Sequence, residues 1–549
     1  MAATAPTAPT ATETTTARGL LVAAAGAQVG LTVVLVHPSL VPFDPARPNV
    51  WLPLTAPLYL LAVVGLARAG LRRGTAVAVV VGLTAVLQLI AITHSPLTSN
   101  DDLRYIWDAK VQLAGVDPYR YAPDAPQLDR LHEPLLFAAQ CGQPHGCSLL
   151  NRPSAHTIYP PVAQAAFVAV RLLSAGGHGG QLPYQVAAAL GVLAVAGLLV
   201  RRATRRGEPV WPVAVWGWSP VVVSEYGNNA HIDWLAVLLS IAGVGTYVAA
   251  RPRWAGALVG AAIATKLYPA LLLPSMLRRH PTRVLVAAAA VVGVGYVPHV
   301  AAVGGRVVGY LPGYLDEEGY SSGSRLLLLG WVLPHPYDTA MGALLLLGLA
   351  VLAYRRSDPD RPELTAVWLV GSAFLVATPN YGWYAGLLVV LVALTRCWEW
   401  LPVAFAPTCT YLYGGTHDRS SFVYLVAALL AATIAYVRFV MQPTGVASTR
   451  AADHIRRHQL LDRALPGRRG RVVEPADRAR RVPGRHPLRR LPGPAGDLPQ
   501  HPDRAPQPPG RAWRAGAGAV PGPSAALGVP PHREGARPVA RGDGDAPVG

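Results

Sequence analysis

Charged residues are scarce in this chain, at 14% of 549 residues, whereas 52% are hydrophobic. A composition this apolar exceeds what a single globular core requires. Apolar runs recur from residue 19 to residue 440, and about 20 such residues are enough to cross a bilayer as a helix. We therefore expect an all-α polytopic integral membrane protein whose membrane domain occupies residues 19–440.

The two ends of the chain lack the signals of a folded domain. Residues 1–18 are low-complexity Ala, Thr and Pro without a cleavable signal peptide, so we expect a disordered N-terminus and a first span, 19–36, that acts as the insertion signal. Residues 450–549 contain 19 Arg and 9 acidic residues, which supply +10 of the net charge of +18. Residues 441–549 are interpreted as a disordered cytoplasmic tail, a segment that binds nucleic acid or anionic lipid, or a frameshifted end. We assign this tail no function and expect no nucleic-acid partner.

Lysine is almost absent from the basic residues. Only Lys110 and Lys266 occur among 48 basic side chains. A compact ammonium differs from a planar guanidinium, and phosphate contact is one use of that difference. Phosphate binding and chance survival are the two explanations that stay open.

Cysteine is also rare, with four residues. Cys141 and Cys147 lie in a predicted external loop, where a disulfide is permitted, and metal binding together with His145 is the weaker option. The other two, Cys397 and Cys409, lie near or in spans and are expected to be unpaired packing residues.

Arginine-rich loops predict the orientation, because cytoplasmic loops carry the excess of basic residues. The long external loop, about 94–182, then contains an interfacial helix at residues 158–175. Residues 254–277 have basic loops at both ends and are broken at Pro269, which indicates a re-entrant pair of half-helices. About twelve full crossings remain. The external segments are then residues 100–182, 227–230, 304–323, 378–384 and 414–420.

Two adjacent carboxylates, Asp101 and Asp102, follow an apolar span at residues 74–93. Ionisable groups at the edge of a span are costly and are therefore candidates for function. Other polar side chains collect in the predicted external segments, although each one alone fits a solvated loop residue or an interfacial anchor. They include Arg104, Asp108, Lys110, Arg152, His156, Tyr159, Glu225, Asn228, Asn229, His231, Asp233, Asp316, Glu317, Glu318, Asn380, Tyr381, Trp383 and Tyr384.

An ordered series of short motifs runs from about residue 74 to residue 384. The motifs are Asn100-Asp101-Asp102-Leu-Arg104-Tyr105 with Trp107-Asp108, Gly115-Val-Asp-Pro118-Tyr119, Asn151-Arg152-Pro153, Thr157-Ile-Tyr159-Pro160-Pro161, His231-Ile-Asp233, Lys266-Leu-Tyr-Pro269 and Asn380-Tyr-Gly-Trp383-Tyr384. Together they resemble bacterial membrane glycosyltransferases of the GT-C type, in particular actinobacterial polyprenyl-phosphate-mannose-dependent mannosyltransferases and glycosyltransferase family 87. Residues 319–323, Gly-Tyr-Ser-Ser-Gly, depart from the aromatic residue and Asn-Ser-Gly that relatives tend to have.

The resemblance implies an enzyme on the extracytoplasmic face of the cell membrane. It would move a sugar, mannose before others, from a polyprenyl-phosphate donor to a hydroxyl of a cell-envelope glycan or glycolipid acceptor, with inversion. Membrane lipids are the remaining expected partner.

The chemistry of that transfer assigns roles to the polar residues. Asp101 or Asp102 is expected to be the catalytic base that takes the proton of the acceptor hydroxyl. The lipid phosphate leaves without needing a proton, so cations suffice to stabilise it. The candidates for donor phosphate binding are Arg104, Lys110, Arg152, His156 and Lys266. The expected substrate-binding residues are Tyr105, Trp107, Tyr159, His231, Asp233, Asn380, Trp383 and Tyr384.

No cofactor and no metal site are assigned, and a divalent ion held by the Asp pair with His231 and Asp233 is the alternative. A nucleotide-sugar donor is not expected, because the chain has no nucleotide-phosphate loop or Rossmann fingerprint. The competing function is a transporter or flippase of lipid-linked glycans, since broken helices are a transporter feature. Against it, the sequence has no internal repeat and its charges gather at one face. A structural scaffold ranks third.

Overall fold

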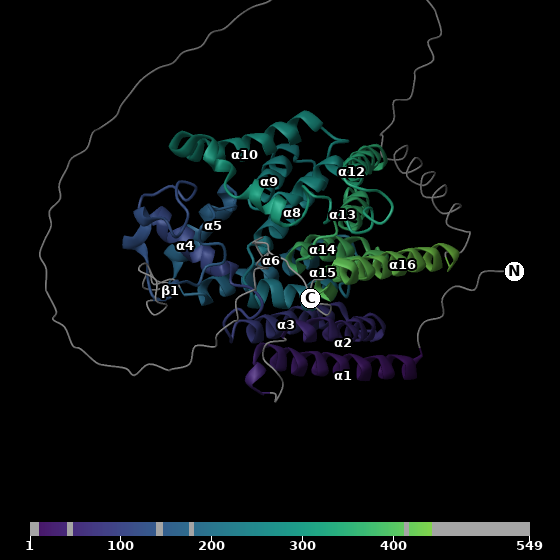
Figure 1. Ribbon diagram of the computed structural model, residues 1–549. Coiled ribbons are helices and arrows are strands. Elements are labelled where there is room, and N and C mark those ends of the chain that lie inside the picture. Colours follow the sequence, from purple (N-terminus) through teal and green to yellow (C-terminus); the bar gives the residue numbers. More distant parts are fainter. Residues whose placement is uncertain (1–9, 41–47, 139–146, 175–179, 411–416, 442–549) are drawn as a thin grey trace, which may run out of the picture. The chain divides into compact units, whose positions relative to one another are not determined.

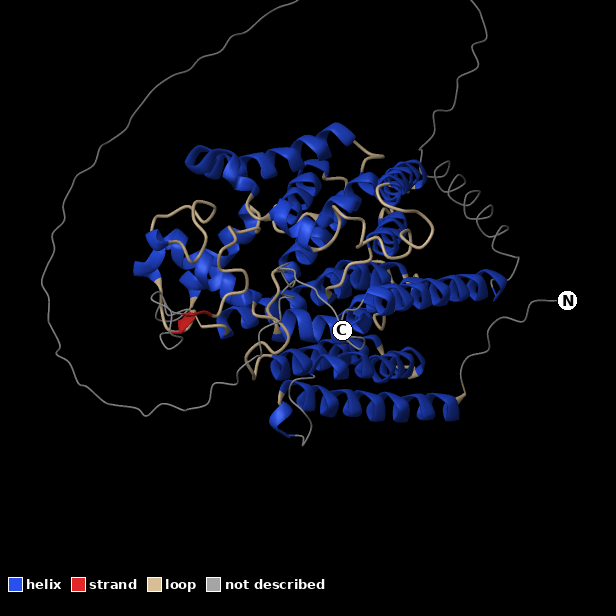
Figure 2. Cartoon of the chain, in the orientation of Figure 1, coloured by secondary structure: helices blue, strands red, loops and turns tan. Residues whose placement is uncertain are grey.

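The computed structural model describes residues 10–40, 48–138, 147–174, 180–410 and 417–441, and most of these residues are helical (Figures 1 and 2). Their strands form one antiparallel pair, β1 (Phe137–Ala138) with β2 (Cys147–Ser148). The predicted all-α class is confirmed. The α-helices are α1 (Ala11–Val36), α2 (Pro48–Arg68), α3 (Arg73–Ala91), α4 (Asp101–Leu113), α5 (Pro161–Leu173), α6 (Leu182–Arg205), α7 (Val213–Gly217), α8 (Asp233–Val248), α9 (Pro252–Ile263), α10 (Pro281–Val303), α11 (Leu311–Glu317), α12 (Tyr337–Arg356), α13 (Glu363–Ala377), α14 (Gly386–Thr395), α15 (Leu401–Cys409) and α16 (His417–Met441).

Six helices among the described residues are long and apolar enough to cross a membrane. The π-helix η4 (Val222–Asn228) and α8 pass the same test as a pair, but they meet at a bend of 114°. Further apolar helices are shorter, so the predicted count of about twelve crossings stays a prediction. The six long spans are Ala11–Val36, Arg73–Ala91, Leu182–Arg205, Pro281–Glu317, Tyr337–Arg356 and Arg419–Met441.

The first helix begins at Ala11, ahead of the predicted span at residue 19. A capping box explains the early start: the Glu13 backbone N–H donates to the Thr10 side chain at 3.2 Å, and the Thr10 N–H donates to the Glu13 carboxylate at 2.7 Å. Helix α1 then packs along α2 and α3 (Figure 1). The predicted tail, beyond Met441, lies outside the described residues. Cys141, for which a disulfide with Cys147 is permitted, also lies outside them. Cys397 and Cys409 are unpaired, as predicted.

The predicted long external loop is folded around a small core of its own. Helix α4 packs against α5, and Tyr105 of α4 stacks on Phe167 of α5 with ring centroids 4.3 Å apart. Trp107 packs edge-on against Phe137 of β1 at 5.1 Å. Helix α5 occupies the place of the predicted interfacial helix, with Ala163 and Phe167 buried and Leu173 exposed. This core holds α4, and therefore Asp101, in a fixed position.

The predicted break near Lys266 is present between α9 and the 3₁₀ helix η5 (Tyr268–Met276). Close packing of α9 on α10 fixes this element: a Cβ added at Gly260 would lie 2.5 Å from the Ala288 carbonyl oxygen, so only glycine permits the approach. The turn after α9 reaches the predicted external loop, since the Ala264 carbonyl accepts a hydrogen bond from the Val162 N–H at 2.9 Å. Lys266 therefore lies beside the start of α5.

Candidate active site

A cavity of about 310 Å³ lies where several of the predicted external segments meet. Its walls come from the start of α4, the loop before α5, the turn at Lys266, helix α11 and the segment before α14. Eight residues singled out from the sequence line it: Asp101, Arg104, Arg152, His156, Tyr159, Lys266, Trp383 and Tyr384. Residues more than 280 positions apart in the chain thus share one site, which we call the Asp101 cavity.

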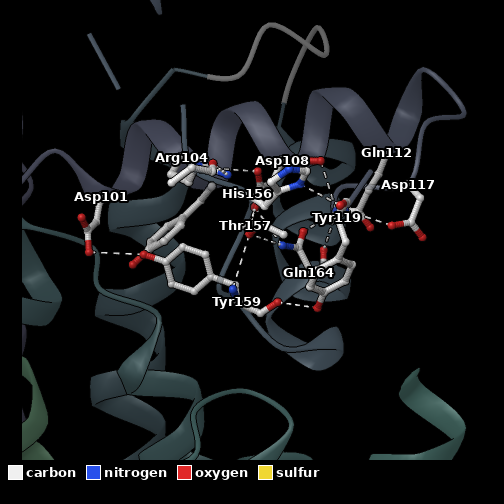
Figure 3. Close-up of polar contacts among 12 residues, drawn as sticks. Asp101, Arg104, Asp108, Gln112, Asp117, Tyr119, His156, Thr157, Tyr159 and Gln164 are labelled. Atoms are coloured by element: carbon white, nitrogen blue, oxygen red, sulfur yellow. Dashed lines mark hydrogen bonds and ion pairs between the residues drawn. The ribbon is translucent and has the colours of Figure 1, made fainter. Parts of the chain in front are cut away.

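One face of α4 carries the polar residues of the site. Asp101, Arg104, Asp108 and Gln112 follow one another at spacings of three or four residues, which places them on one side of a helix. Figure 3 shows this face turned toward the segment from His156 to Gln164. Arg104 is held at both ends of its guanidinium, because Nε donates to Asp108 Oδ1 at 3.0 Å and Nη2 donates to the Ala155 carbonyl at 2.9 Å.

Asp108 anchors this arrangement from beneath. Its Oδ2 accepts hydrogen bonds from the Thr157 hydroxyl at 2.5 Å and from Gln164 Nε2 at 2.8 Å (Figure 3). Asp108 is buried, and a buried carboxylate that accepts several hydrogen bonds is stabilised as a structural group. It therefore positions Arg104 and the loop before α5 and does not itself line the cavity.

The Asp101 carboxylate is held by two donors at the cavity wall. Asn151 Nδ2 donates to Oδ1 at 2.6 Å, and the Tyr159 hydroxyl donates to Oδ2 at 3.2 Å. Asp101 is the first residue of α4, and a helix N-terminus favours a negatively charged group. The side chain is only partly buried, so the carboxylate is oriented yet open to the cavity.

Asp102 has a different environment, although it is the next residue. Its side chain is fully buried and does not line the cavity. Neither carboxylate oxygen has a hydrogen-bond partner of normal geometry among the described residues, and the Gln181 side chain and the Leu103 backbone are among its polar neighbours. Burial raises the pKa of Asp102 to about 7.

Lys266 projects into the cavity from the break between α9 and η5. Its Nζ lies 5.2 Å from the ring centroid of Tyr159 and 5.7 Å from that of Tyr384, distances at which a cation is attracted to an aromatic face. Behind these rings, Nζ is 3.5 Å from Oδ2 of Asp233, which is the fully buried first residue of α8. Two tyrosines and one buried carboxylate thus hold the ammonium at the cavity wall.

The bend between η4 and α8 supports the site from the membrane domain. Asn228 Oδ1 accepts a hydrogen bond from the Leu97 N–H at 3.0 Å, and Asn229 Oδ1 accepts one from the Thr98 N–H at 3.2 Å. These bonds fix the segment that leads into Asp101. His231 is buried at the same bend, and its ring lies 4.1 Å from that of Trp383.

Helix α11 and the residue before it form another part of the cavity wall. Arg152 Nε donates to the Glu317 carboxylate at 2.8 Å, and the Tyr310 hydroxyl donates to the same carboxylate at 2.9 Å. Hydrogen bonding to Glu317 raises the pKa of the Arg152 guanidinium further, so its charge is permanent. His156 is held by the loop, with Nδ1 2.9 Å from the Tyr119 carbonyl oxygen.

Other predicted site residues lie outside the cavity. The Lys110 ammonium donates to Glu133 at 2.7 Å, and Asn380 lies near Thr410, whose hydroxyl is 3.4 Å from the Asn380 carbonyl oxygen. The residues outside the cavity lining are Asp102, Tyr105, Trp107, Lys110, His231, Asp233 and Asn380. In the part of the chain that the structure describes, no group of three or more His, Cys, Asp and Glu side chains is placed to hold a metal ion.

Sequence reasoning gave no site role to Asn151 or to four tyrosines that line the cavity, Tyr268, Tyr310, Tyr314 and Tyr320. The Tyr314 hydroxyl is 2.8 Å from that of Tyr384, which joins α11 to the segment before α14. A signal was available, because Tyr310 and Tyr314 are one helical turn apart in a predicted external segment. In this segment, the acidic residues 316–318 that follow them are the ones singled out from the sequence.

One of three comparisons with known proteins finds a match. The family model described as glycosyltransferase family 87 matches residues 157–379, a region that includes Tyr159 and Lys266 but not Asp101. The search of curated proteins and the search of solved structures each find no match. The match is to family 87, one of the families that the sequence resembles, and it points to a glycosyltransferase; the apolar helices point to a membrane protein. Over residues 157–379, the chain is therefore similar to glycosyltransferase family 87.

Proposed function

We propose that the protein transfers a sugar, mannose before others, from a polyprenyl-phosphate donor to a hydroxyl of a cell-envelope glycan or glycolipid, with inversion, at the extracytoplasmic face. One observation carries the proposal: the Asp101 carboxylate opens into a cavity that it shares with Arg104, Arg152 and Lys266. A base and a set of cations are the two elements that this transfer requires.

Asp101 is the base in this proposal. The acceptor hydroxyl oxygen forms a bond to the anomeric carbon while the bond from that carbon to the phosphate oxygen breaks. The hydroxyl proton passes to Asp101, an effect worth on the order of 10² to 10⁴ in rate. Asn151 and Tyr159 orient the carboxylate by their hydrogen bonds, at 2.6 and 3.2 Å. Asp102 has no access to the cavity and takes no part in the proton transfer.

Arg104, Arg152, His156 and Lys266 bind the donor phosphate and stabilise the charge that it gains as the bond breaks. The aromatic side chains of the cavity offer faces for the sugar ring and the first isoprene units. Tyr159, Trp383 and Tyr384 are the predicted residues in this group, and Tyr310, Tyr314 and Tyr320 join them. A lipid-linked donor suits a cavity whose walls are mostly apolar and aromatic with a few convergent charges.

The test is transfer by the purified full chain from radiolabelled polyprenyl-phosphate mannose, glucose and arabinose to extracted envelope lipids and glycans. We expect label from one donor in one acceptor, with the opposite anomeric configuration to the donor. Loss of the label in Asp101→Asn, with donor binding retained, supports the enzyme. A flippase would instead move the lipid-linked donor across vesicles and transfer no label, and this result would contradict the proposal.

Sidedness is tested separately. Cysteine placed at Ser99, next to the Asp pair, in a chain without its native cysteines should react with an impermeant thiol reagent in intact cells. Reaction only after permeabilisation would place the cavity on the cytoplasmic side and would contradict the orientation predicted from the arginine-rich loops.

A further inference from the structure

A second cavity, of about 740 Å³, is an apolar groove between three helices of the membrane domain. Helix α15 packs against both α2 and α16, whereas α2 and α16 have few contacts with each other, so α15 is the floor and the other two are the walls. The lining includes Leu60, Val64, Phe405, Val426 and Leu430. We call it the α2–α16 groove, and it shares no lining residue with the Asp101 cavity.

The length of the groove matches one lipid chain. Its lining runs from Ala56 to Arg68 on α2 and from Phe422 to Ile434 on α16. Each wall is about 18 Å long at the helical rise of about 1.5 Å per residue. One leaflet contributes about 15 Å of hydrocarbon to the bilayer core. The groove is thus long enough for an extended acyl chain of a single leaflet.

One end of the groove carries a positive charge. Arg68 is the only charged residue of the lining, and it has no hydrogen bond or ion pair with any residue that the structure describes. Other arginines of the predicted cytoplasmic loops do have carboxylate partners. Examples are the ion pairs Arg202 with Glu363, Arg279 with Asp360 and Arg438 with Glu399. Arg68 therefore remains available for an anionic partner outside the described residues.

Two tryptophans mark the same end. Trp211 stacks on Trp398 with ring centroids 5.4 Å apart, and both line the groove. Arg73, the first residue of α3 and five residues after the end of α2, donates to the Glu208 carbonyl at 3.2 Å, so the turn from α2 to α3 contacts the segment that leads to Trp211. Tryptophan is enriched at the level of the lipid headgroups. The groove thus runs from the bilayer interior to a headgroup level marked by Arg68 and the tryptophan pair.

We propose that the α2–α16 groove binds an anionic glycerophospholipid, with one acyl chain along the groove and the lipid phosphate at Arg68. Basic pockets between membrane helices on the cytoplasmic side bind such headgroups. An arginine side chain also suits phosphate, because its planar fork donates two parallel hydrogen bonds. This proposal rests on the membrane domain and not on the glycosyl transfer proposed for the Asp101 cavity.

The headgroup contact is tested by native mass spectrometry of the full chain, released from micelles that contain phosphatidylglycerol or phosphatidylcholine with identical acyl chains. We expect preferential retention of phosphatidylglycerol, and a loss of about fivefold in that preference in Arg68→Gln. The matched control is Arg72→Gln, which removes a basic residue of the same loop outside the groove lining. Equal losses in the two variants would mean diffuse attraction to a basic surface and would overturn the proposal.

The acyl-chain contact has its own pair of variants. Leu60 lines the groove and Leu61 does not, although they are exposed to the same extent, 42% and 44%. Leu60→Trp should lower the retention of both lipids, while Leu61→Trp should not. Val426→Trp tests the opposite wall if Leu60→Trp does not fold. Equal retention in all variants would show that no lipid chain occupies the groove. If the unaltered protein is a dimer and Leu60→Trp makes it a monomer, a second copy of the chain covers the groove and the proposal is wrong.

Discussion

Helix α4 has a cavity side, which carries Asp101, and a core side, which carries Asp102, and the two sides differ although these residues are adjacent and identical. Asp101 and Asp102 are neighbours, but one carboxylate has two hydrogen-bond donors and opens into the cavity, whereas the other is buried without a partner of normal geometry among the described residues. Successive residues of an α-helix point about 100° apart. A single step along the helix thus separates a group suited to proton transfer from a group held in the protein interior.

The largest expected effect comes from the cavity side. Asp101→Asn keeps the shape of the side chain and both neighbours but removes proton acceptance. We expect the rate of sugar transfer in single turnover to fall by about 10² or more, with donor binding unchanged. Parallel loss of donor binding would indicate that Asp101 holds the substrate and does not act as the base.

The second prediction compares the two lysines of the chain. Lys266→Met leaves the buried Asp233 without its cation and removes an ammonium from the cavity, so donor binding should weaken about 30-fold. Lys110→Met is the matched control, because Lys110 pairs with Glu133 outside the cavity. Equilibrium binding of a labelled polyprenyl phosphate measures both. Equal weakening in the two variants would contradict the assignment of Lys266 to the donor phosphate.

The third prediction concerns the hydroxyl that orients Asp101. Tyr159→Phe removes one hydrogen bond to the carboxylate while keeping the ring near Lys266, so transfer should slow about fivefold. Tyr105→Phe serves as the comparison, since Tyr105 lies in the core beside Phe167. The kcat of each variant, divided by that of the unaltered protein, measures how much the hydroxyl contributes to the orientation of the Asp101 carboxylate. A larger effect of Tyr105→Phe would place the sensitive hydroxyl in the core.

The fourth prediction concerns Asp102 on the core side. Its replacement should change the stability of the protein and leave the activity almost unchanged. Because the pKa of Asp102 is raised to about 7, the protonated form is favoured in the folded protein. The resulting stability is fully present below the unfolded pKa near 4 and is lost as pH rises toward 7, by up to about 4 kcal/mol. Asp102→Asn does not titrate and should unfold at a higher temperature than the unaltered protein at pH 8, with the difference shrinking by pH 4. A difference that stays constant with pH would contradict this account.

Much of the site could be predicted from local patterns. The break at Lys266, the polar cluster in the predicted external segments and most of the cations and aromatics of the cavity follow from apolar runs and the residues that interrupt them. The choice between Asp101 and Asp102 also had a signal. As a helix from residue 101, the segment places Asp101 in line with Arg104 and Asp108, and Asp102 in line with Ile106.

Other contacts had no signal in the sequence. The pair Arg152 with Glu317 joins residues 165 positions apart, and Lys266 meets Asp233 from a different helix. Their meeting depends on how the predicted external loop, residues 94–182, folds around its own core and on how α9 packs against α10, and no local spacing in the sequence encodes either. Composition also does not give the length of each helix, since several apolar helices are shorter than a full crossing.

The most direct test of the central claim is the effect of both Asp→Asn changes on single-turnover transfer by the purified chain at saturating donor. We predict that Asp102→Asn stays within about threefold of the unaltered protein and adds nothing when combined with Asp101→Asn, which alone costs about 10² or more. An Asp102→Asn loss as large as that of Asp101→Asn would contradict the division of α4 into a cavity side and a core side.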